Sequence, residues 1–125
     1  MKNYELLNLR DRLQSISQLQ NEFSVSVGYK ILKNINKVNS ALIEYQEMQN
    51  RIVKKYAKEG ETSIQVKEDD PRYNDIKNDM EELLQQECDD IELQKISIHD
   101  IENEKLTLKD LANFSCMLDD ESEDK

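Results

Sequence analysis

Two pairs of carboxylates are the residues whose types and spacing could support catalysis. Glu44 and Glu47 are three positions apart, as are Glu87 and Asp90, and this spacing puts both members of a pair on one side of a helix. Carboxylate oxygens are the ligands that Mg²⁺ prefers in proteins, so acids at this spacing could contribute to a metal site. No basic substrate-binding residues accompany them, and Asp90 is expected to lie beyond its helix. The sequence therefore favours a solvated acidic face.

The single histidine and the two cysteines form no recognisable catalytic or metal-binding set. His99, Asp100 and Cys88 are close in the sequence, but no nucleophile motif surrounds them. Two thiols without a CxxC spacing, together with one histidine, make a poor zinc site. We therefore expect a surface or capping role for His99, reduced core positions for Cys88 and Cys116, and no metal or cofactor.

Basic and aromatic residues are interleaved over residues 29–58, where one long helix is expected. Such residues could hold the phosphate groups of a small ligand, or contact a partner. The alternative is an ordinary solvated helix face with the tyrosines at seam positions, Tyr45 and Tyr56, in the core, and the sequence favours this alternative. The candidate ligand- or partner-binding residues are Lys30, Lys33, Lys37, Tyr45, Arg51 and Lys55.

The net charge of −10 is concentrated in the second half of the chain. Residues 1–60 contain ten basic and six acidic residues, a net charge of +4, whereas residues 61–125 contain seven basic and twenty-one acidic residues, a net charge of −14. Because an acidic half repels phosphate backbones, general binding to nucleic acid is disfavoured. A polar N-terminus and the lack of a long apolar run predict neither a signal peptide nor a membrane span, so we expect a cytoplasmic protein.

Hydrophobic periodicity predicts the elements that must position these residues. A first helix is expected over residues 3–20, a long central helix over 27–58 and a third over 71–87, where Asp70 and Pro71 supply a cap and a first-turn proline. The central helix carries an apolar seam in steps of four and three, with one polar member: Ile31, Ile35, Val38, Leu42, Tyr45, Gln49, Ile52 and Tyr56.

Two capping boxes mark the last elements of the domain. Ser97 with Asp100 is expected to start a single turn, and Thr107 with Asp110 a final helix through Met117. The residues of this helix predicted to point inward are Leu108, Leu111, Phe114 and Leu118.

Two alternating segments predict a small amount of β structure. Residues 62–67 and 91–96 could pair as a two-stranded antiparallel ribbon packed on the helices. The predicted fold class is therefore mainly α (α+β), a long central helix packed with two or three shorter helices and this ribbon. Residues 1–118 form the single helical domain, and residues 119–125 an acidic flexible tail whose deletion should leave folding unchanged.

Most of the chain resembles a family of short phage- and prophage-encoded proteins of unknown function. The resemblance lies in the order of four stretches, YKILKNI (29–35), RIVKKYA (51–57), EELLQQE (81–87) and ISIHDIE (96–102), the last of which leads to Leu106 and Thr107. The resemblance implies that the protein is encoded by a phage or prophage, but it implies no activity. No residue of this chain can be assigned to a functional site from it.

Small size, acidic charge and the lack of a catalytic set favour a non-catalytic binding protein. In the phage setting that the resemblance implies, such a protein would sequester or inhibit a host protein or a small nucleotide immune signal. The same features allow a virion assembly or structural accessory protein. The enzymatic alternative rests on Glu44, Glu47, Glu87 and Asp90, whose pattern is similar to the ExxE…ExxD arrangement of all-α nucleotide pyrophosphohydrolases.

The length of the central seam also predicts self-association. The first helix can cover only part of the seam, and the commonest way to bury the remainder is a closed homo-oligomer, most simply a two-fold dimer. The competing possibility is a monomer in which the first and third helices together cover the central helix.

Overall fold

The structure is a computed structural model that describes residues 1–58, 60 and 66–119. Within these ranges the chain forms helices joined by turns and extended segments and contains no strand. The helices are α1 (Asn3–Ser17), α2 (Val25–Ala41), α3 (Ile43–Tyr56), α4 (Tyr73–Gln85) and α5 (Leu108–Phe114), with single 3₁₀ turns at Ile98–Asp100 and Ser115–Met117.

Helices α2 and α3 form one bent helix of 32 residues, which confirms the predicted long central helix. It begins and ends two residues earlier than predicted, at Val25 and Tyr56. The hydrogen-bond ladder continues through the bend, because the Leu42 amide donates to Val38 O at 3.0 Å and the Gln46 amide donates to Leu42 O at 2.9 Å. The bend arises at Leu42 itself, whose ψ of −6° departs from the helical value of about −42°.

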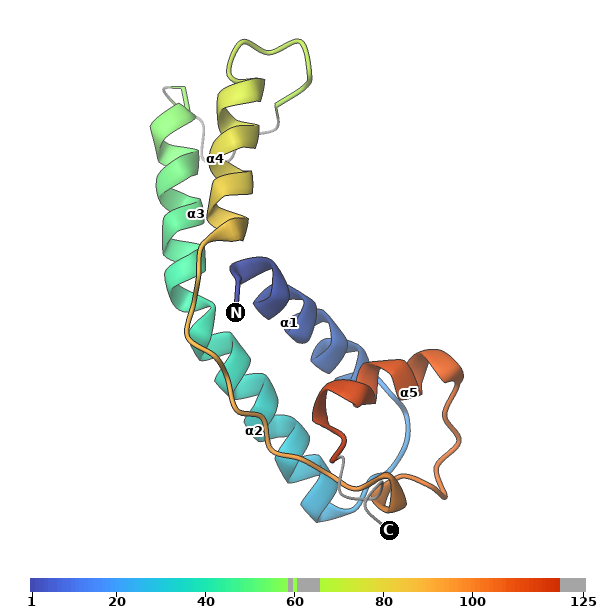
Figure 1. Ribbon diagram of the computed structural model, residues 1–125. Coiled ribbons are helices and arrows are strands. Elements are labelled where there is room, and N and C mark those ends of the chain that lie inside the picture. Colours follow the sequence, from blue (N-terminus) through green and yellow to red (C-terminus); the bar gives the residue numbers. More distant parts are fainter. Residues whose placement is uncertain (59, 61–65, 120–125) are drawn as a thin grey trace.

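The apolar seam of this bent helix is covered end to end by two other helices of the same chain. Helix α1 lies along α2, and α4 lies along α3, so that the start of α1 meets the end of α4 (Figure 1). The buried Asn3 joins them, because its amide donates to Gln86 O at 3.0 Å and its Nδ2 donates to Leu83 O at 2.8 Å. The seam on which the prediction of self-association rested is therefore already covered within one chain.

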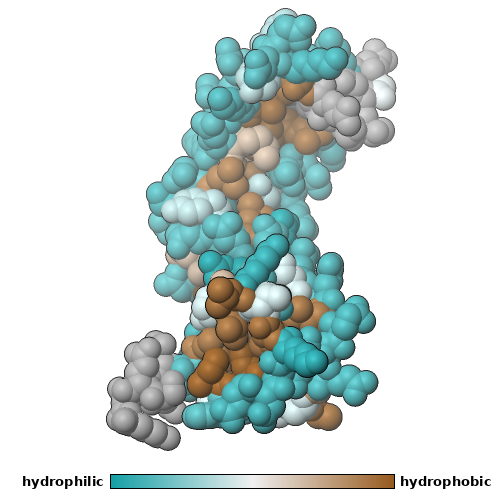
Figure 2. Space-filling view, turned by 90° about the vertical axis from the view of Figure 1, so that its right-hand side faces the viewer, coloured by the Kyte–Doolittle hydropathy of each residue, from teal (hydrophilic) through white to brown (hydrophobic). Residues whose placement is uncertain are grey.

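Helix α5 closes the lower core on the far side of α1. Phe114 is fully buried and meets the Phe23 ring edge-on, with the ring centroids 5.7 Å apart. The Arg12 side chain of α1 also donates to Ala112 O at 2.8 Å. Leu108 was predicted to point inward but is 87% exposed, because it is the first residue of this short helix and lies on its outer side. On the face shown in Figure 2, apolar surface gathers near α5 and along the α3–α4 hairpin.

Polar side chains cap the starts of three elements. Ser24 Oγ accepts from the Val27 amide at 3.2 Å and starts α2. The Ser97 and Thr107 capping boxes both form. The Ser97 amide donates to the Asp100 carboxylate at 2.9 Å, and the Thr107 amide donates to the Asp110 carboxylate at 3.0 Å. They start the single turn and the final helix respectively, as the sequence predicts.

The segment 91–96 is extended but forms no strand with any described residue. Residues 62–65 of the predicted partner strand lie outside the described residues, and Val66 and Lys67 form no strand. We call residues 88–97 the return segment, because it runs from the end of α4 back along the bent helix (Figure 1). Its backbone is bound by a side chain instead of a strand: Asn34 Oδ1 accepts from the Gln94 amide at 2.7 Å, and Asn34 Nδ2 donates to Gln94 O at 3.0 Å. The alternation of apolar and polar residues over 91–96 correctly indicated an extended segment. It could not indicate that this segment packs on a helix rather than pairs with a strand.

The return segment ends in a single parallel bridge to the last described residues. The Ile96 amide donates to Met117 O, and the Asp119 amide donates to Ile96 O, both at 2.8 Å. Asp119, where the acidic tail was predicted to begin, is thus tied to the fold, while residues 120–125 lie outside the described residues.

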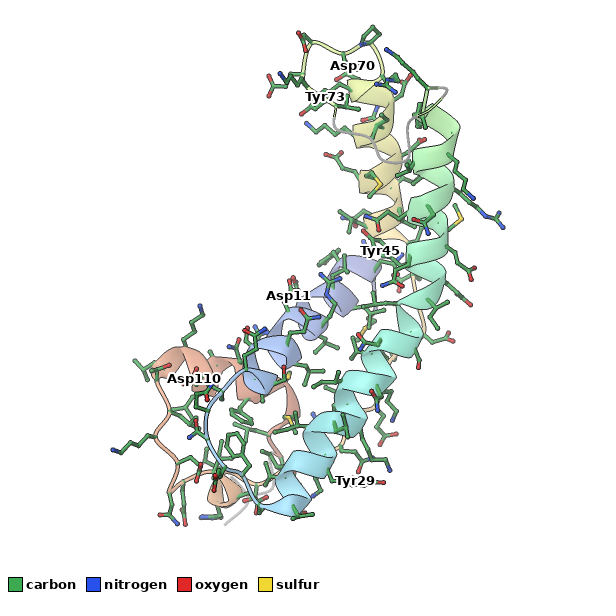
Figure 3. All side chains as sticks on the ribbon, turned by 180° about the vertical axis from the view of Figure 1, so that it is seen from behind. Asp11, Tyr29, Tyr45, Asp70, Tyr73 and Asp110 are labelled. Atoms are coloured by element: carbon green, nitrogen blue, oxygen red, sulfur yellow. The ribbon has the colours of Figure 1, made fainter. Side chains whose placement is uncertain are left out.

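Helix α4 begins two residues after the predicted position, at Tyr73 rather than Pro71. Asp70 caps the preceding turn instead, since its Oδ1 accepts from the Arg72 amide at 2.8 Å and its Oδ2 lies 3.0 Å from Arg72 Nη2. Arg72 Nη1 also donates to Tyr56 O at 2.8 Å, which ties the start of α4 to the end of α3. This cluster lies at the far end of the hairpin (Figure 3).

The first prediction concerns Leu42, which is buried at the bend, as is Val38 one turn before it. Leu42→Ala should lower the free energy of unfolding by about 2–5 kcal/mol, because it leaves a cavity where α1 and α4 meet the bent helix. Ile43→Ala is the matched control, since Ile43 is the exposed neighbour and its truncation should cost far less. Denaturant unfolding measures both, and equal costs would contradict the assignment of the core.

The second prediction concerns Asn34, the fully buried amide that holds the return segment. Asn34→Ala should lower the free energy of unfolding by about 1–3 kcal/mol, because the partly buried backbone amide of Gln94 loses its acceptor. Asn36→Ala removes the same group from the exposed side of α2 and should be neutral or slightly stabilising, since alanine has the higher helix propensity. A neutral Asn34→Ala in chemical denaturation would show that the return segment is held by other contacts.

The third prediction concerns the pH dependence of the Asp70 turn. The hydrogen bonds from the Arg72 side chain and backbone lower the pKa of Asp70 from 3.8 to about 2. A carboxyl group with a lowered folded-state pKa stabilises the fold above its unfolded pKa, and this stabilisation is lost as the pH falls toward the folded value. The unfolding midpoint of the wild type should therefore drop between pH 3.8 and about 2, and Asp70→Asn should flatten that part of the curve. Asp69→Asn, its exposed neighbour, should leave the wild-type slope intact.

Candidate functional site

Two of the six candidate binding residues hold the return segment in place. Lys30 Nζ donates to Lys95 O at 3.1 Å, and Lys37 Nζ donates to Glu92 O. Together with Asn34 between them, they form one edge of α2 that faces the return segment. Their ammonium groups remain exposed to solvent on one side, so they contribute positive charge to this edge, but their hydrogen bonds already serve the fold.

Lys33 lies on the outer side of the same helix. Its Nζ is 5.3 Å from the centroid of the Tyr29 ring one turn earlier, a distance at which an ammonium group is attracted to an aromatic face. Tyr29 lies near the start of α2, on the side of the helix away from α1 (Figure 3). The pair therefore presents a cation and an aromatic ring together at the surface.

Tyr45 is a core residue and presents no binding surface. It is buried on α3 close to the start of α1 (Figure 3). Burial raises the pKa of its hydroxyl above the ordinary value of 10.0, and the Arg10 charge opposes this shift. Its place in the seam agrees with the alternative that the sequence favoured for the tyrosines.

Arg51 and Lys55 lie together at one edge of a groove between α3 and α4. The groove has a volume of about 560 Å³ and is lined by Met48, Arg51, Ile52, Lys55, Asp79, Glu82, Leu83 and Gln86. Lys55 Nζ is 3.3 Å from Asp79 Oδ2, and the Tyr56 hydroxyl donates to the same oxygen at 2.7 Å. The Tyr56 hydrogen bond, and then the Lys55 bond, lower the pKa of Asp79. This groove is acidic on its α4 edge and basic on its α3 edge.

The six residues therefore occupy separate places along the bent helix. Lys30 and Arg51 are 21 positions apart, which corresponds to about 30 Å along a helix. Tyr45 lies between them in the core. The structure brings Arg51 and Lys55 to one groove and Lys30, Lys33 and Lys37 to one stretch of α2, but it does not unite the two sets.

The four candidate carboxylates also lie in two separate places. Glu44 and Glu47 are exposed on α3. Glu87 and Asp90 lie beyond α4, where both contact the amino group of Met1. Within residues 1–58, 60 and 66–119, no group of three histidine, cysteine or acidic side chains is placed to hold a metal ion.

His99 and the two cysteines have the local roles expected of them. The His99 ring is exposed, with Nδ1 3.0 Å from Glu102 Oε2. Cys88 and Cys116 are free and partly buried, and burial raises the pKa of both thiols. Their Sγ atoms lie 3.4 Å from Met1 O and 3.2 Å from Asn113 O respectively.

The most distinctive surface was missed by the sequence analysis. Val25, Tyr29, Leu32 and Ile43 are 91%, 59%, 54% and 53% exposed. Together with Asn36 and Asn39 they follow steps of four and three, which places all six on one face of the bent helix, opposite its buried seam. We call this face the outer stripe; it contains no charged residue. The 4-3 spacing was present in the sequence, but the stronger seam on the other side of the helix concealed it.

A small apolar pocket opens beside the outer stripe. Its volume is about 250 Å³, and its lining includes Leu19 and Phe23 before α2 and Gly28, Leu32 and Ile35 within it. A Cβ atom at Gly28 would meet nothing within 4 Å apart from the adjacent residues and the backbone of its own helix, so the space over Gly28 is open. We call this open part of the pocket the notch, and an apolar side chain of a partner could enter it.

Two further observations bear on function. No helix in the described part of the chain is both long and apolar enough to cross a membrane. No protein-family model, curated protein or solved structure matches this chain.

Proposed function

We propose that this chain is a non-catalytic binding protein that captures a partner protein on the outer stripe of its bent helix. The observation that carries the proposal is the exposure of Val25, Tyr29, Leu32 and Ile43 on one uncharged helix face. Large apolar side chains left in water forgo about 1.5–3 kcal/mol of burial each. Several of them along one uncharged face are typical of an interaction site rather than of an ordinary surface.

The composition of the outer stripe suits a protein interface. Tyrosine is enriched among residues that dominate binding energy, and charged residues are depleted at interface centres. The Lys33 ammonium over the Tyr29 ring limits the rotation of that ring, so less entropy is lost when a partner covers it. The notch at Gly28 and Leu32 offers a place for one apolar anchor of the partner.

The charge beside the stripe indicates the chemistry of the partner. Lys30, Lys33 and Lys37 recur at helical spacing and form a basic border along one side of it. A helix with an apolar face and an acidic flank would match both features, in the manner of peptide helices that bind grooves through residues one turn apart. We therefore infer a partner protein with an exposed amphipathic, acidic helix.

A small nucleotide signal is less well supported as the ligand. Phosphate recognition needs several cations that converge on one point. Here Lys30 and Lys37 already donate to backbone carbonyls, and Arg51 and Lys55 share their groove with Asp79 and Glu82. Lys33 and Lys37 do line one pocket of about 290 Å³, together with Asn34, Asn36 and Gln94, but its lining contains no third cation.

The phage setting remains part of the proposal through the resemblance of the sequence. A small binding protein with an exposed helical face would act there by occupying a host factor, in the sense of counter-defence. A protein that blocks a surface of its partner needs affinity for that surface but no catalytic site. The separate positions of Glu44 and Glu47 on α3 and of Glu87 and Asp90 beyond α4 agree with this.

The fourth prediction tests this surface by affinity capture from host cells. Wild-type protein should enrich a defined partner, and Leu32→Glu should lose it at least about tenfold, because a charge is placed at the centre of the stripe. Gly28→Leu should lose it too, because a leucine side chain would occupy the notch, and its Cβ atom fits the open space over Gly28 in the free protein.

Leu108→Glu is the matched control, because it adds the same charge at an exposed leucine on α5, away from the stripe. It should retain the partner. Circular dichroism should show all variants folded. Equal retention of the partner by Leu32→Glu and wild type would contradict the proposal, and enrichment of a virion protein instead of a host protein would favour an assembly role.

A further inference from the structure

The α3–α4 hairpin is a thin, two-helix part of the molecule. It extends beyond α1, α2 and α5, and no third helix of the described chain lies against the groove lined by Met48, Ile52 and Leu83 (Figure 1). The floor of this groove is apolar, since Ile52 and Leu83 form it, and Met48 is 43% exposed at its edge. A pair of helices buries less apolar surface than a four-helix bundle, in which two such hairpins face each other.

The charges along the groove are arranged in two opposite rows. Arg51 and Lys55 form the α3 edge, and Asp79 and Glu82 form the α4 edge. The two helices run antiparallel, and the 3.3 Å pair of Lys55 with Asp79 fixes their relative height. Because the helices are antiparallel, the residue four positions before Lys55 on α3 lies at the height of the residues three to four positions after Asp79 on α4. Arg51 is therefore level with Glu82 and Leu83.

We propose that a second copy of this chain docks on this groove, with α3 of each copy packed against α4 of the other. A two-fold axis running parallel to the hairpin brings each basic edge over the acidic edge of the partner at the same height. Arg51 of one copy then faces Glu82 of the other, twice per dimer. A two-fold axis across the hairpin would instead place the two basic edges over each other, and like charges in contact disfavour that arrangement.

The bend of the long helix makes room for this arrangement. Helix α2 leaves the hairpin on the side of α4, and α1 and α5 follow it (Figure 1). Rotation by half a turn about an axis parallel to the hairpin sends the lower halves of the two copies in opposite directions. The hairpins can therefore approach closely while the lower cores diverge and the outer stripes stay accessible. The α3–α4 groove is a different surface from the outer stripe, so the dimer does not depend on the proposed partner binding.

A charge-exchange experiment tests the dimer and its geometry. Light scattering coupled to size exclusion at micromolar concentration should give twice the chain mass of 14.7 kDa for the wild type. Arg51→Glu alone and Glu82→Arg alone should each weaken the dimer by about tenfold or more, because each creates two like-charge contacts. An equimolar mixture of the two variants should restore the dimer, since every contact between unlike copies is again of opposite charge. The charge controls Lys109→Glu and Glu22→Arg, at exposed positions away from the groove, should remain dimeric.

Met48→Lys supplies a second, independent variant. The side chain is already partly exposed, so the free chain should keep its helical circular dichroism while the dimer is lost. A wild type of single-chain mass at every concentration would overturn the proposal. So would dimers that survive Arg51→Glu, Glu82→Arg and Met48→Lys, or a mixture of the two charge variants that stays monomeric.

Discussion

The fold depends on the need to cover one apolar face that runs the whole length of a 32-residue helix. Such a helix is about 48 Å long, whereas α1 and α4, with 15 and 13 residues, reach only about 22 and 20 Å. Neither helix can cover the seam alone, so the chain places them end to end. Asn3 ties the two helices together at the junction, because its backbone amide donates to Gln86 O and its side chain donates to Leu83 O at the end of α4. The bend at Leu42 lies near this junction. It separates the half of the seam on α2, which α1 covers, from the half on α3, which α4 covers.

The same constraint explains the path of the return segment. The chain must travel from the end of α4 to the lower core, along a helix that has no free backbone groups to pair with it. A buried backbone amide without a partner is costly, and the Asn34 side chain supplies both an acceptor and a donor for Gln94. Lys30 and Lys37 bind two further carbonyls on either side. One edge of α2 thus acts as a substitute for a neighbouring strand.

Covering the seam from one side leaves the opposite side of the helix and the hairpin groove open. The outer stripe is uncharged, apolar and bordered by lysines, whereas the groove is apolar at its floor and carries opposite charges on its two edges. A surface of the first kind suits a different protein with a complementary acidic helix. A surface of the second kind is complementary to itself, which is why we assign it to another copy of the chain. The two surfaces face different directions, so a dimer would present two outer stripes at once.

The sequence alone was sufficient to predict the helices, the buried seam and the capping boxes at Ser97 and Thr107, because these follow from local periodicity and from polar residues next to the helix starts. It also indicated that residues 91–96 are extended. It could not decide what supports that segment, because Asn34 and Gln94 are 60 positions apart and an asparagine in a helix shows no sign of its partner. For the same reason it could not separate Lys30 and Lys37, which bind backbone carbonyls, from Lys33, which faces outward over Tyr29. All three have the same charge and similar spacing. Only the tertiary structure decided which side of each helix is covered, because that depends on how segments far apart in the sequence pack against one another. The structure thereby distinguishes lysines that hold the fold together from a lysine left at the surface.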